Sequence, residues 1–127
     1  MKVAVAAKGT DIDAQASPVF GRCQAFVIVD NETLASEGLA NPALSARGGA
    51  GVQAAQFVID RGVKIVIAGN VGPNAFAVLD AAGVPVYQFD GGSVRQAIDA
   101  YNAGELRAQG GATVPDHTGM GRGRQAR

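Results

Sequence analysis

The second half of the sequence alternates between helical and strand patterns, and this alternation restricts the fold more than any other feature. Apolar residues at helical spacing over 52–59 predict a helix, and the apolar, β-branched run 63–68 that follows predicts the strongest strand of the chain. Pro73 favours the start of a second helix, and 84–89 indicate a further strand. Residues 93–101 begin with the Ser-x-x-Gln capping box of a third helix. Such alternation is typical of parallel strands joined by right-handed crossovers.

The first half of the sequence predicts three strands before the first helix. Residues 2–7 alternate as a strand does, and 25–29 form a nearly continuous apolar run. Residues 34–39 predict a weaker strand that pairs with 25–29 as a hairpin across the turn at 30–32. The segment 8–22 contains glycine and proline and predicts a long loop. The predicted order is therefore βββαβαβα, which is an α/β fold.

Composition limits the chain to one globular domain. The 127 residues suffice for one core, and 47% of them are apolar while 17% are charged. We expect a single domain over 1–108 and a flexible tail over 109–127, where five glycines occur without apolar periodicity. The tail holds three arginines against one aspartate, whereas the body holds eight basic and ten acidic residues.

Charge and hydropathy argue against two classes of partner. A body without basic excess is a poor nucleic-acid binder. No apolar run approaches the roughly 20 residues of a membrane span, and the short apolar run at the N-terminus indicates a strand and not a signal peptide. A single cysteine gives no intrachain disulfide framework, so a cytoplasmic location is the default expectation. The oligomeric state stays open.

Two glycine-rich turns lead directly into predicted helices, at Arg47–Gly51 and Gly69–Asn74. Helix N-termini carry unpaired backbone N–H groups and a partial positive charge, and glycine lets the backbone approach a ligand closely. Either turn alone is explained by the preference of glycine for tight turns. The pair predicts an anion-binding site.

The predicted topology brings several loops to one edge of the sheet. Ligands of open α/β sheets bind beyond the carboxyl ends of the parallel strands, and loops 8–22, 69–74 and 90–92 belong to that edge. The turn at 47–51 joins them if the third strand runs parallel to the first, which we expect.

Three phrases of the sequence resemble the family of dinitrogenase iron–molybdenum cofactor-binding and biosynthesis accessory proteins. They are Ser17–Cys23, Gly49–Gln56 and Ile67–Phe76, and the resemblance spans nearly all of 1–107. The chain looks especially like the orange-protein branch, whose members hold a molybdenum–copper sulfide cluster without covalent attachment. The resemblance implies a ribonuclease H-like α/β fold, a mixed five-stranded sheet with its second strand antiparallel and helices on both faces.

The resemblance also implies a function, that of a non-catalytic carrier or accessory protein for a molybdenum- or iron-containing metal-sulfide cluster, with protein partners in cofactor delivery. Such a cluster brings most of its own ligands and is anionic, so backbone N–H groups and arginines suit it. The residues expected to bind it are Arg22, Cys23, Arg47, Gly48, Gly49, Gly51, Asn70, Gly72 and Asn74. Solvated surface charge is the alternative for the two arginines. Many family members carry a histidine just before the Gly-Ala-Gly turn, where this chain has Ser45-Ala46-Arg47-Gly48.

Cys23 and His117 are candidate metal ligands. A soft thiolate suits copper(I), iron or molybdenum sulfides, and the adjacent Arg22 would favour the thiolate form. A small buried hydrophobe is the equal alternative for Cys23. His117 lies in the predicted tail near Met120, where plain solvation is the alternative. One cysteine and one histidine fall short of a four-ligand zinc site.

Two other functions stay open. The chain could be a small enzyme or sensor that binds a phosphate or nucleotide at the same edge, although it lacks a Walker Lys-Ser/Thr pair and a Gly-x-Gly-x-x-Gly after the first strand. The chain could instead be a cofactor-free protein-interaction or regulatory module. Nuclease activity is not expected, because the opening strand holds no carboxylate for two-metal chemistry, and no other enzymatic activity is predicted.

Overall fold

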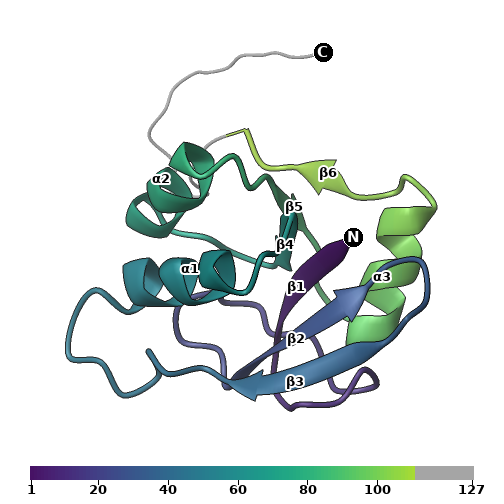
Figure 1. The fold of residues 1–127 in the computed structure, drawn as a ribbon, viewed down its shortest axis with the longest axis horizontal. Coiled ribbons are helices and arrows are strands. Elements are labelled where there is room, and N and C mark those ends of the chain that lie inside the picture. The colour runs from purple at the N-terminus through teal and green to yellow at the C-terminus, as the bar shows by residue number, and fades with distance from the viewer. Residues whose placement is uncertain (111–127) are drawn as a thin grey trace.

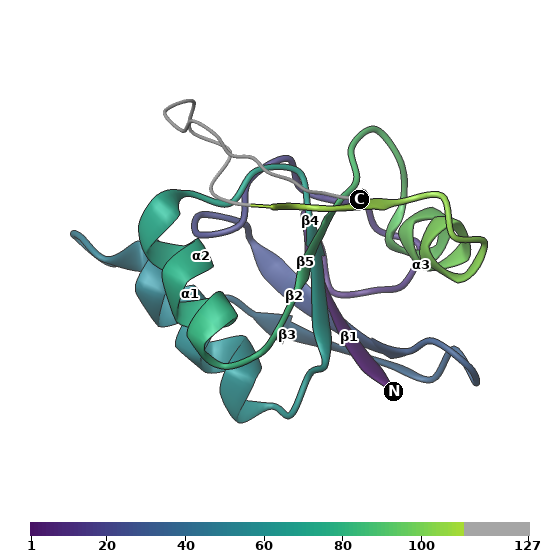
Figure 2. The same cartoon turned by 90° about the horizontal axis from the view of Figure 1, so that it is seen from above.

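The strands of the computed structural model lie in the order β3-β2-β1-β4-β5-β6, in one six-stranded sheet. The structure describes residues 1–110. The elements are β1 (Lys2–Ala7), β2 (Ala25–Asp30), β3 (Ser36–Ala40), α1 (Ala50–Asp60), β4 (Ile65–Ala68), α2 (Pro73–Ala81), β5 (Val86–Gln88), α3 (Val94–Asn102) and β6 (Arg107–Ala108). Helices α1 and α2 lie side by side on one face of the sheet, and α3 covers the other face (Figures 1 and 2).

Strand direction decides which loops share an edge. β1 pairs with β2 and β2 pairs with β3 in antiparallel register, so β3 runs parallel to β1. β4 and β5 are also parallel to β1. The carboxyl ends of β1, β3, β4 and β5 therefore meet at one edge, and the turn before α1 lies at the same edge as the turn before α2. This confirms the direction expected for the third strand.

The α/β class, the mixed open sheet and the helices on both faces are confirmed, but the expected count of five strands is wrong. β6 is a sixth strand, antiparallel to β5, with Tyr87 opposite Ala108 and Gln88 opposite Arg107. Its two residues are exposed, and backbone pairing with β5 holds them. The sequence therefore shows no apolar pattern that would predict this strand. β2 is accordingly not alone in running against the parallel strands. The ribonuclease H-like assignment stays an expectation from the family resemblance.

Side-chain alternation along the strands divides the core between the two faces of the sheet. Val66 and Ala68 of β4 belong to the cluster under α1 and α2, whereas Ile65 and Ile67 belong to the cluster under α3. Both clusters consist mainly of valine, isoleucine and alanine. The fully buried alanines of α1, such as Ala54, let this helix lie close to the sheet.

Several predicted boundaries shift by one or two residues. β3 begins at Ser36 and not at Leu34, because Leu34 has a φ of 65° and its N–H donates to the carbonyl of Asp30 at 2.8 Å within the hairpin turn. β4 and β5 are shorter than the predicted 63–68 and 84–89. The flexible tail was predicted for 109–127, and residues 111–127 lie outside the described part of the chain. Within residues 1–110, no helix is long and apolar enough to span a membrane.

Candidate functional site

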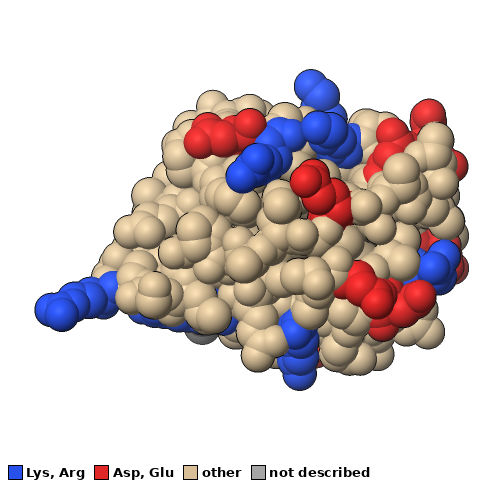
Figure 3. Space-filling view, turned by 60° about the horizontal axis from the view of Figure 1, so that its bottom comes forward, with Lys and Arg blue, Asp and Glu red and all other residues tan. Residues whose placement is uncertain are grey.

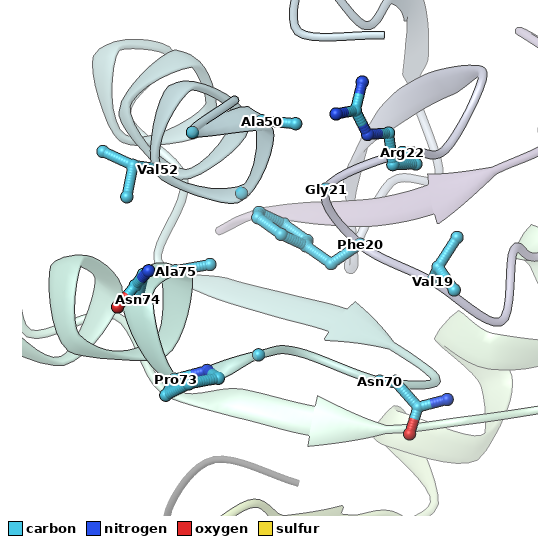
Figure 4. A pocket seen from close by; sticks show the side chains of 13 residues that line it. Val19, Phe20, Gly21, Arg22, Ala50, Val52, Asn70, Pro73, Asn74 and Ala75 are labelled. Carbon is cyan, nitrogen blue, oxygen red and sulfur yellow. The ribbon is translucent and has the colours of Figure 1, made fainter. Parts of the chain in front are cut away.

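A cavity of about 410 Å³ opens at the carboxyl edge of the sheet, between the first turns of α1 and α2 and the loop after β1 (Figure 4). Its walls come from three segments that are far apart in the sequence. The lining residues are Val19, Phe20, Gly21, Arg22, Gly49, Ala50, Gly51, Val52, Asn70, Gly72, Pro73, Asn74 and Ala75.

Hydrogen bonds fix the loop after β1 against the loop after β4. The N–H of Phe20 donates to the carbonyl of Asn70 at 3.1 Å, and the Asn70 side-chain amide donates to the carbonyl of Pro18 at 3.1 Å. Gly69 permits this approach, because a Cβ atom there would lie 2.6 Å from the Pro18 carbonyl oxygen. Asn70 therefore has a structural role at the cavity wall, and Figure 4 shows its side chain pointing away from the cavity.

Close glycine contacts bring the three walls together. A Cβ atom on Gly21 would lie 2.9 Å from the Cα atom of Gly51, so the loop after β1 touches the first turn of α1 directly. A Cβ atom on Gly51 would lie 3.2 Å from the Cβ atom of Ala75 in the first turn of α2. The two helix N-termini consequently lie next to each other at the cavity.

Five backbone N–H groups at these helix N-termini have no hydrogen-bond partner among the described residues. The first bond that reaches back to the N-cap is from Gln53 to Gly49 in α1 and from Phe76 to Gly72 in α2. Neither helix has a side-chain cap, whereas α3 has a complete capping box at Ser93. The free groups, all on cavity-lining residues, belong to Ala50, Gly51, Val52, Asn74 and Ala75. Pro73 has no N–H to offer.

The electrostatic environment of the cavity is positive. No Asp or Glu lines it, and no acidic residue occupies the first turn of α1 or α2. The partial positive charges of both helix N-termini add to the charge of Arg22. Arg22 also has a structural role, since its Nη1 atom donates to the carbonyls of Leu44 and Ala46 at 3.1 and 2.7 Å.

Apolar side chains form the remainder of the lining. The ring of Phe20 lies centrally in Figure 4, between α1 and the loop after β1, and it packs on Phe26 with ring centroids 5.2 Å apart. Val19 and Val52 line the cavity and lie on opposite sides of it. The cavity therefore combines backbone donors with apolar walls, an arrangement that suits a large anion of low hydration.

The structure brings six of the residues predicted for the site to the cavity wall: Arg22, Gly49, Gly51, Asn70, Gly72 and Asn74. Gly49 is the N-cap of α1 with a φ of 69°, a conformation that favours glycine. Arg47 and Gly48 precede it and are exposed, but they do not line the cavity. His117 lies outside the described residues.

Cys23 lies in the core and not at the cavity. Its exposed fraction is 2%, it belongs to the cluster under α1 and α2, and its Sγ atom lies 3.7 Å from the side-chain nitrogen of Asn41. Burial raises the pKa of the Cys23 thiol to about 12, against the smaller opposing effect of hydrogen bonds from neighbouring groups. In this arrangement the thiol is protonated at neutral pH and cannot reach a ligand in the cavity.

Sequence reasoning missed the apolar part of the lining, which includes Val19, Phe20, Val52 and Ala75. The adjacent apolar pair Val19-Phe20 within a loop rich in small and polar residues was an available signal. The contact of Gly21 with Gly51 has no sequence signal, because it joins segments 30 residues apart.

The described residues contain no group of three or more His, Cys, Asp or Glu side chains that could hold a metal ion. A metal bound in this cavity would therefore have to bring most of its own ligands, and the protein would supply hydrogen bonds and counter-charge.

The fold and the cavity define a small α/β protein with a cavity between two helix N-termini at the carboxyl edge of its sheet. Residues 1–104 match the family described as dinitrogenase iron-molybdenum cofactor, and the chain belongs to this family.

Solved structures of relatives agree with this assignment. The apo form of the orange protein from Desulfovibrio gigas is 38% identical, superposes with a TM-score of 0.85, and the match covers 88% of this chain and 95% of that one. A NifB-like protein from Thermotoga is 38% identical with a TM-score of 0.75, over 94% of this chain and 98% of that one. A sequence comparison finds a further relative, an uncharacterized protein of Methanocaldococcus jannaschii, which is 33% identical over 71% of this chain and 79% of its own length.

Proposed function

We propose that this protein is a non-catalytic carrier or accessory protein for a molybdenum- or iron-containing metal-sulfide cluster, which it binds non-covalently. One observation carries the proposal: two helix N-termini without side-chain caps open into one cavity that no carboxylate lines. The family to which the chain belongs supports a cofactor-related role. The sequence resemblance to the orange-protein branch, whose members hold a molybdenum–copper sulfide cluster, favours that cargo over an iron–molybdenum cluster.

The residues present fit such a cargo. A metal-sulfide cluster exposes sulfide ligands that accept hydrogen bonds, and the free N–H groups of both helices can donate to them. Val19, Phe20 and Val52 would contact the less hydrated faces of the cluster. At Gly72 a Cβ atom would meet nothing within 4 Å, so the wall there is open to a bulky ligand.

The positive side chains of the site would balance the charge of the cluster. Arg22 lines the cavity, and Arg47 stands two residues before the N-cap of α1, near the place where many family members carry histidine. Arg47 would thus replace a metal ligand with a counter-charge. A role for Cys23 as a ligand would require the core around it to open, so we assign it no part in binding. We propose a cytoplasmic location and hand-over of the cargo to other proteins.

Reconstitution tests the proposal directly. The purified protein is incubated anaerobically with tetrathiomolybdate and copper(I), desalted, and analysed for molybdenum and copper by mass spectrometry and for charge-transfer bands in the visible spectrum. We expect co-elution of both metals with a coloured protein. A colourless, metal-free protein after this treatment would contradict the proposal.

A pair of variants locates the cargo in the cavity. Gly72→Leu adds bulk to the cavity wall at a position with φ −71° and ψ 172°, which any residue adopts without strain. Ala81→Leu introduces the same leucine side chain at an exposed position at the other end of α2. We expect Gly72→Leu to lose most of the bound metal and Ala81→Leu to retain it. Equal loading of the two folded variants would place the cargo elsewhere.

A phosphate or nucleotide is the second candidate ligand, because backbone N–H groups at helix N-termini bind anions of several kinds. Thermal unfolding in the presence of ATP or inorganic phosphate separates the candidates. A ligand present at 100 times its Kd stabilises the folded state by about 2.7 kcal/mol. Stabilisation by ATP without stabilisation by tetrathiomolybdate would favour the second candidate.

A further inference from the structure

The exposed apolar side chains of this protein gather around the mouth of the cavity. Four large hydrophobic residues are exposed among residues 1–110, and three of them belong to this region. The exposed fractions are 42% for Val19, 44% for Leu44 and 38% for Val52. The fourth, Met1, is at the start of β1, which is the opposite edge of the sheet.

Contacts of Arg22 place Leu44 in this group. Val19 and Val52 line the cavity themselves and lie on opposite sides of it (Figure 4). Arg22 lines the cavity too, and its guanidinium holds the carbonyl of Leu44 at 3.1 Å. The apolar patch therefore extends from the cavity mouth over the loop between β3 and α1.

The segments that form this patch contain no acidic residue. Asp and Glu are absent from 14–29, 38–59 and 61–79, which supply the loop after β1, the β3–α1 loop with most of α1, and most of α2. Arg22 and Arg47 are the basic residues nearest the cavity in these segments, and both are exposed. The β3–α1 loop projects at the left in Figure 1, and in Figure 3 the left end of the molecule shows basic and uncharged atoms but no acidic ones.

We propose that Val19, Leu44, Val52, Arg22 and Arg47 form a docking surface for a partner protein that presents an apolar side chain flanked by carboxylates. Exposed apolar residues clustered at one place mark interaction sites more often than scattered ones do. Arginine is enriched in protein interfaces, and charge complementarity selects the partner and accelerates encounter. A docked partner would cover the cavity mouth, so a cargo could pass between the two proteins without crossing solvent. The docking surface goes beyond the proposed function and does not depend on the identity of the cargo.

The composition of the patch favours a protein over a lipid surface. Peripheral binding to anionic membranes typically uses clusters of 4–8 lysines or arginines, or an amphipathic helix with a basic face. This patch has two arginines and three aliphatic side chains, spread over two loops and one helix turn. Such a surface fits the small, mixed interface of a transient protein complex.

Selection from a random linear peptide library displayed on phage tests the proposal with the full chain in its metal-free form. We expect the selected peptides to be enriched in Asp and Glu next to Leu, Phe or Trp. Synthetic copies of these peptides should bind in solution, as measured by fluorescence anisotropy, and binding should weaken as salt concentration rises.

Surface variants assign the binding to this patch. Arg47→Glu and Leu44→Ser change exposed side chains and should each weaken peptide binding by roughly fivefold or more, with unchanged circular dichroism. Lys64→Glu is the matched control, because it makes the same charge change at an exposed position two residues after Gly62, just before β4 and at the opposite edge of the sheet. It should leave the affinity within about twofold.

Three results would overturn the proposal. The first is a selection without acidic and apolar enrichment. The second is a set of peptides whose binding is insensitive to Arg47→Glu and Leu44→Ser. The third is co-sedimentation of the protein with vesicles of phosphatidylcholine and phosphatidylglycerol in the absence of peptide binding, which would make the patch a membrane contact. None of these results bears on metal loading, so the proposed carrier function is tested separately.

Discussion

At the scale of single residues, the buried thiol of Cys23 makes stability depend on pH. Burial raises the pKa of this thiol to about 12 in the folded chain, from its ordinary value of 9.0. Between these values the unfolded chain loses the proton while the folded chain keeps it, and this favours unfolding. The contribution is fully present below about pH 9 and is lost progressively as the pH rises towards 12.

We therefore expect the free energy of unfolding to fall with rising pH in this window by up to about 1.4 kcal/mol per pH unit, in addition to the effects of other groups. Cys23→Ala removes the thiol and serves as the reference. Urea unfolding of both proteins, at about pH 8 and about pH 10, measures the difference. A constant difference at both pH values would show that the thiol is accessible to solvent. Slow alkylation of native Cys23 by iodoacetamide, with fast alkylation in urea, is the independent check.

Gly21 and Gly48 differ in the space that the structure leaves for a side chain, so their alanine variants should differ in stability. Gly21→Ala places a methyl group 2.9 Å from the backbone of Gly51, so we expect a loss of about 1–3 kcal/mol of stability, measured by urea unfolding. Gly48→Ala is the control, because a methyl group there meets nothing within 4 Å and the φ of Gly48 is not in the left-handed region. We expect it to be neutral or slightly stabilising. Equal losses in the two variants would mean that the contact between Gly21 and Gly51 is not tight.

At the scale of elements, the N-terminus of α3 has a side-chain cap, whereas the N-termini of α1 and α2 at the cavity have none. Ser93 caps α3 by accepting from the N–H of Gln96 at 3.1 Å. Gly72 occupies the same position in α2 with similar backbone angles, φ −71° and ψ 172° against −84° and 167°. A capping side chain would fit at Gly72, and its absence leaves N–H groups available to a ligand.

Gly72→Asp should therefore stabilise the fold and impair binding. An aspartate cap satisfies the N–H groups of α2 and interacts favourably with the helix dipole, which is worth a few tenths to about 1 kcal/mol. The same charge repels an anionic cargo, so tetrathiomolybdate affinity should fall by roughly tenfold or more. Thermal unfolding and isothermal titration calorimetry measure the two effects. Ser93→Ala provides the opposite case, with a loss of about 1 kcal/mol and unchanged affinity. A fall in both stability and affinity at Gly72→Asp would contradict this assignment.

Elements with their own local pattern could be predicted from the sequence, and those that depend on tertiary contacts could not. The helices beginning at Ala50, Pro73 and Val94 have apolar periodicity, capping residues or a proline at the first position, so their existence and order follow from the sequence. β6 has two exposed residues and exists because β5 offers it an unpaired edge. Its absence from the prediction accounts for the wrong strand count.

The candidate site was predictable only where glycine turns precede helices. The turns around Gly49 and Gly72 indicate the backbone N–H donors at the two helix N-termini. That both turns lie at the carboxyl edge of the sheet follows from the direction of β3, which its hairpin with β2 determines. The wall contributed by Phe20 depends on the loop after β1 folding back onto α1 and α2, a contact between distant segments. The burial of Cys23 likewise depends on which side of the loop faces the core. Local patterns do not encode either outcome.

At the scale of the whole molecule, β6 is the last strand of the sheet, and the residue after it contacts the loop before α2. The N–H of Gln109 donates to the carbonyl of Val86 at 2.7 Å, and its side-chain amide donates to the carbonyl of Val71 at 3.4 Å. Val71 lies between two cavity-lining residues, Asn70 and Gly72. The segment 107–109 therefore belongs to the folded domain, and it also supports the loop that carries the α2 N-terminus.

Truncated chains should show where the folded domain ends. A chain of residues 1–110 keeps every described element, and we expect its free energy of unfolding to stay within about 0.5 kcal/mol of that of the full chain. A chain of residues 1–104 retains the segment matched by the family but lacks β6 and Gln109. It should lose about 1–3 kcal/mol, because the hydrogen bonds from β6 to β5 and from Gln109 to the Val86 and Val71 carbonyls are removed. The exposed edge of β5 should also promote self-association, which sedimentation velocity detects.

The same two truncated chains test whether metal loading and peptide binding need residues 111–127. Every residue assigned to the cavity and to the docking surface precedes residue 76, so the 1–110 chain should load metal and bind the selected peptides as the full chain does. Loss of peptide binding with retained metal loading would assign the interaction to residues 111–127 and their arginines. Loss of metal loading alone would support the prediction that His117 is a metal ligand. The 1–104 chain should load less metal than the 1–110 chain, because Val71 and the first turn of α2 lose the support of Gln109.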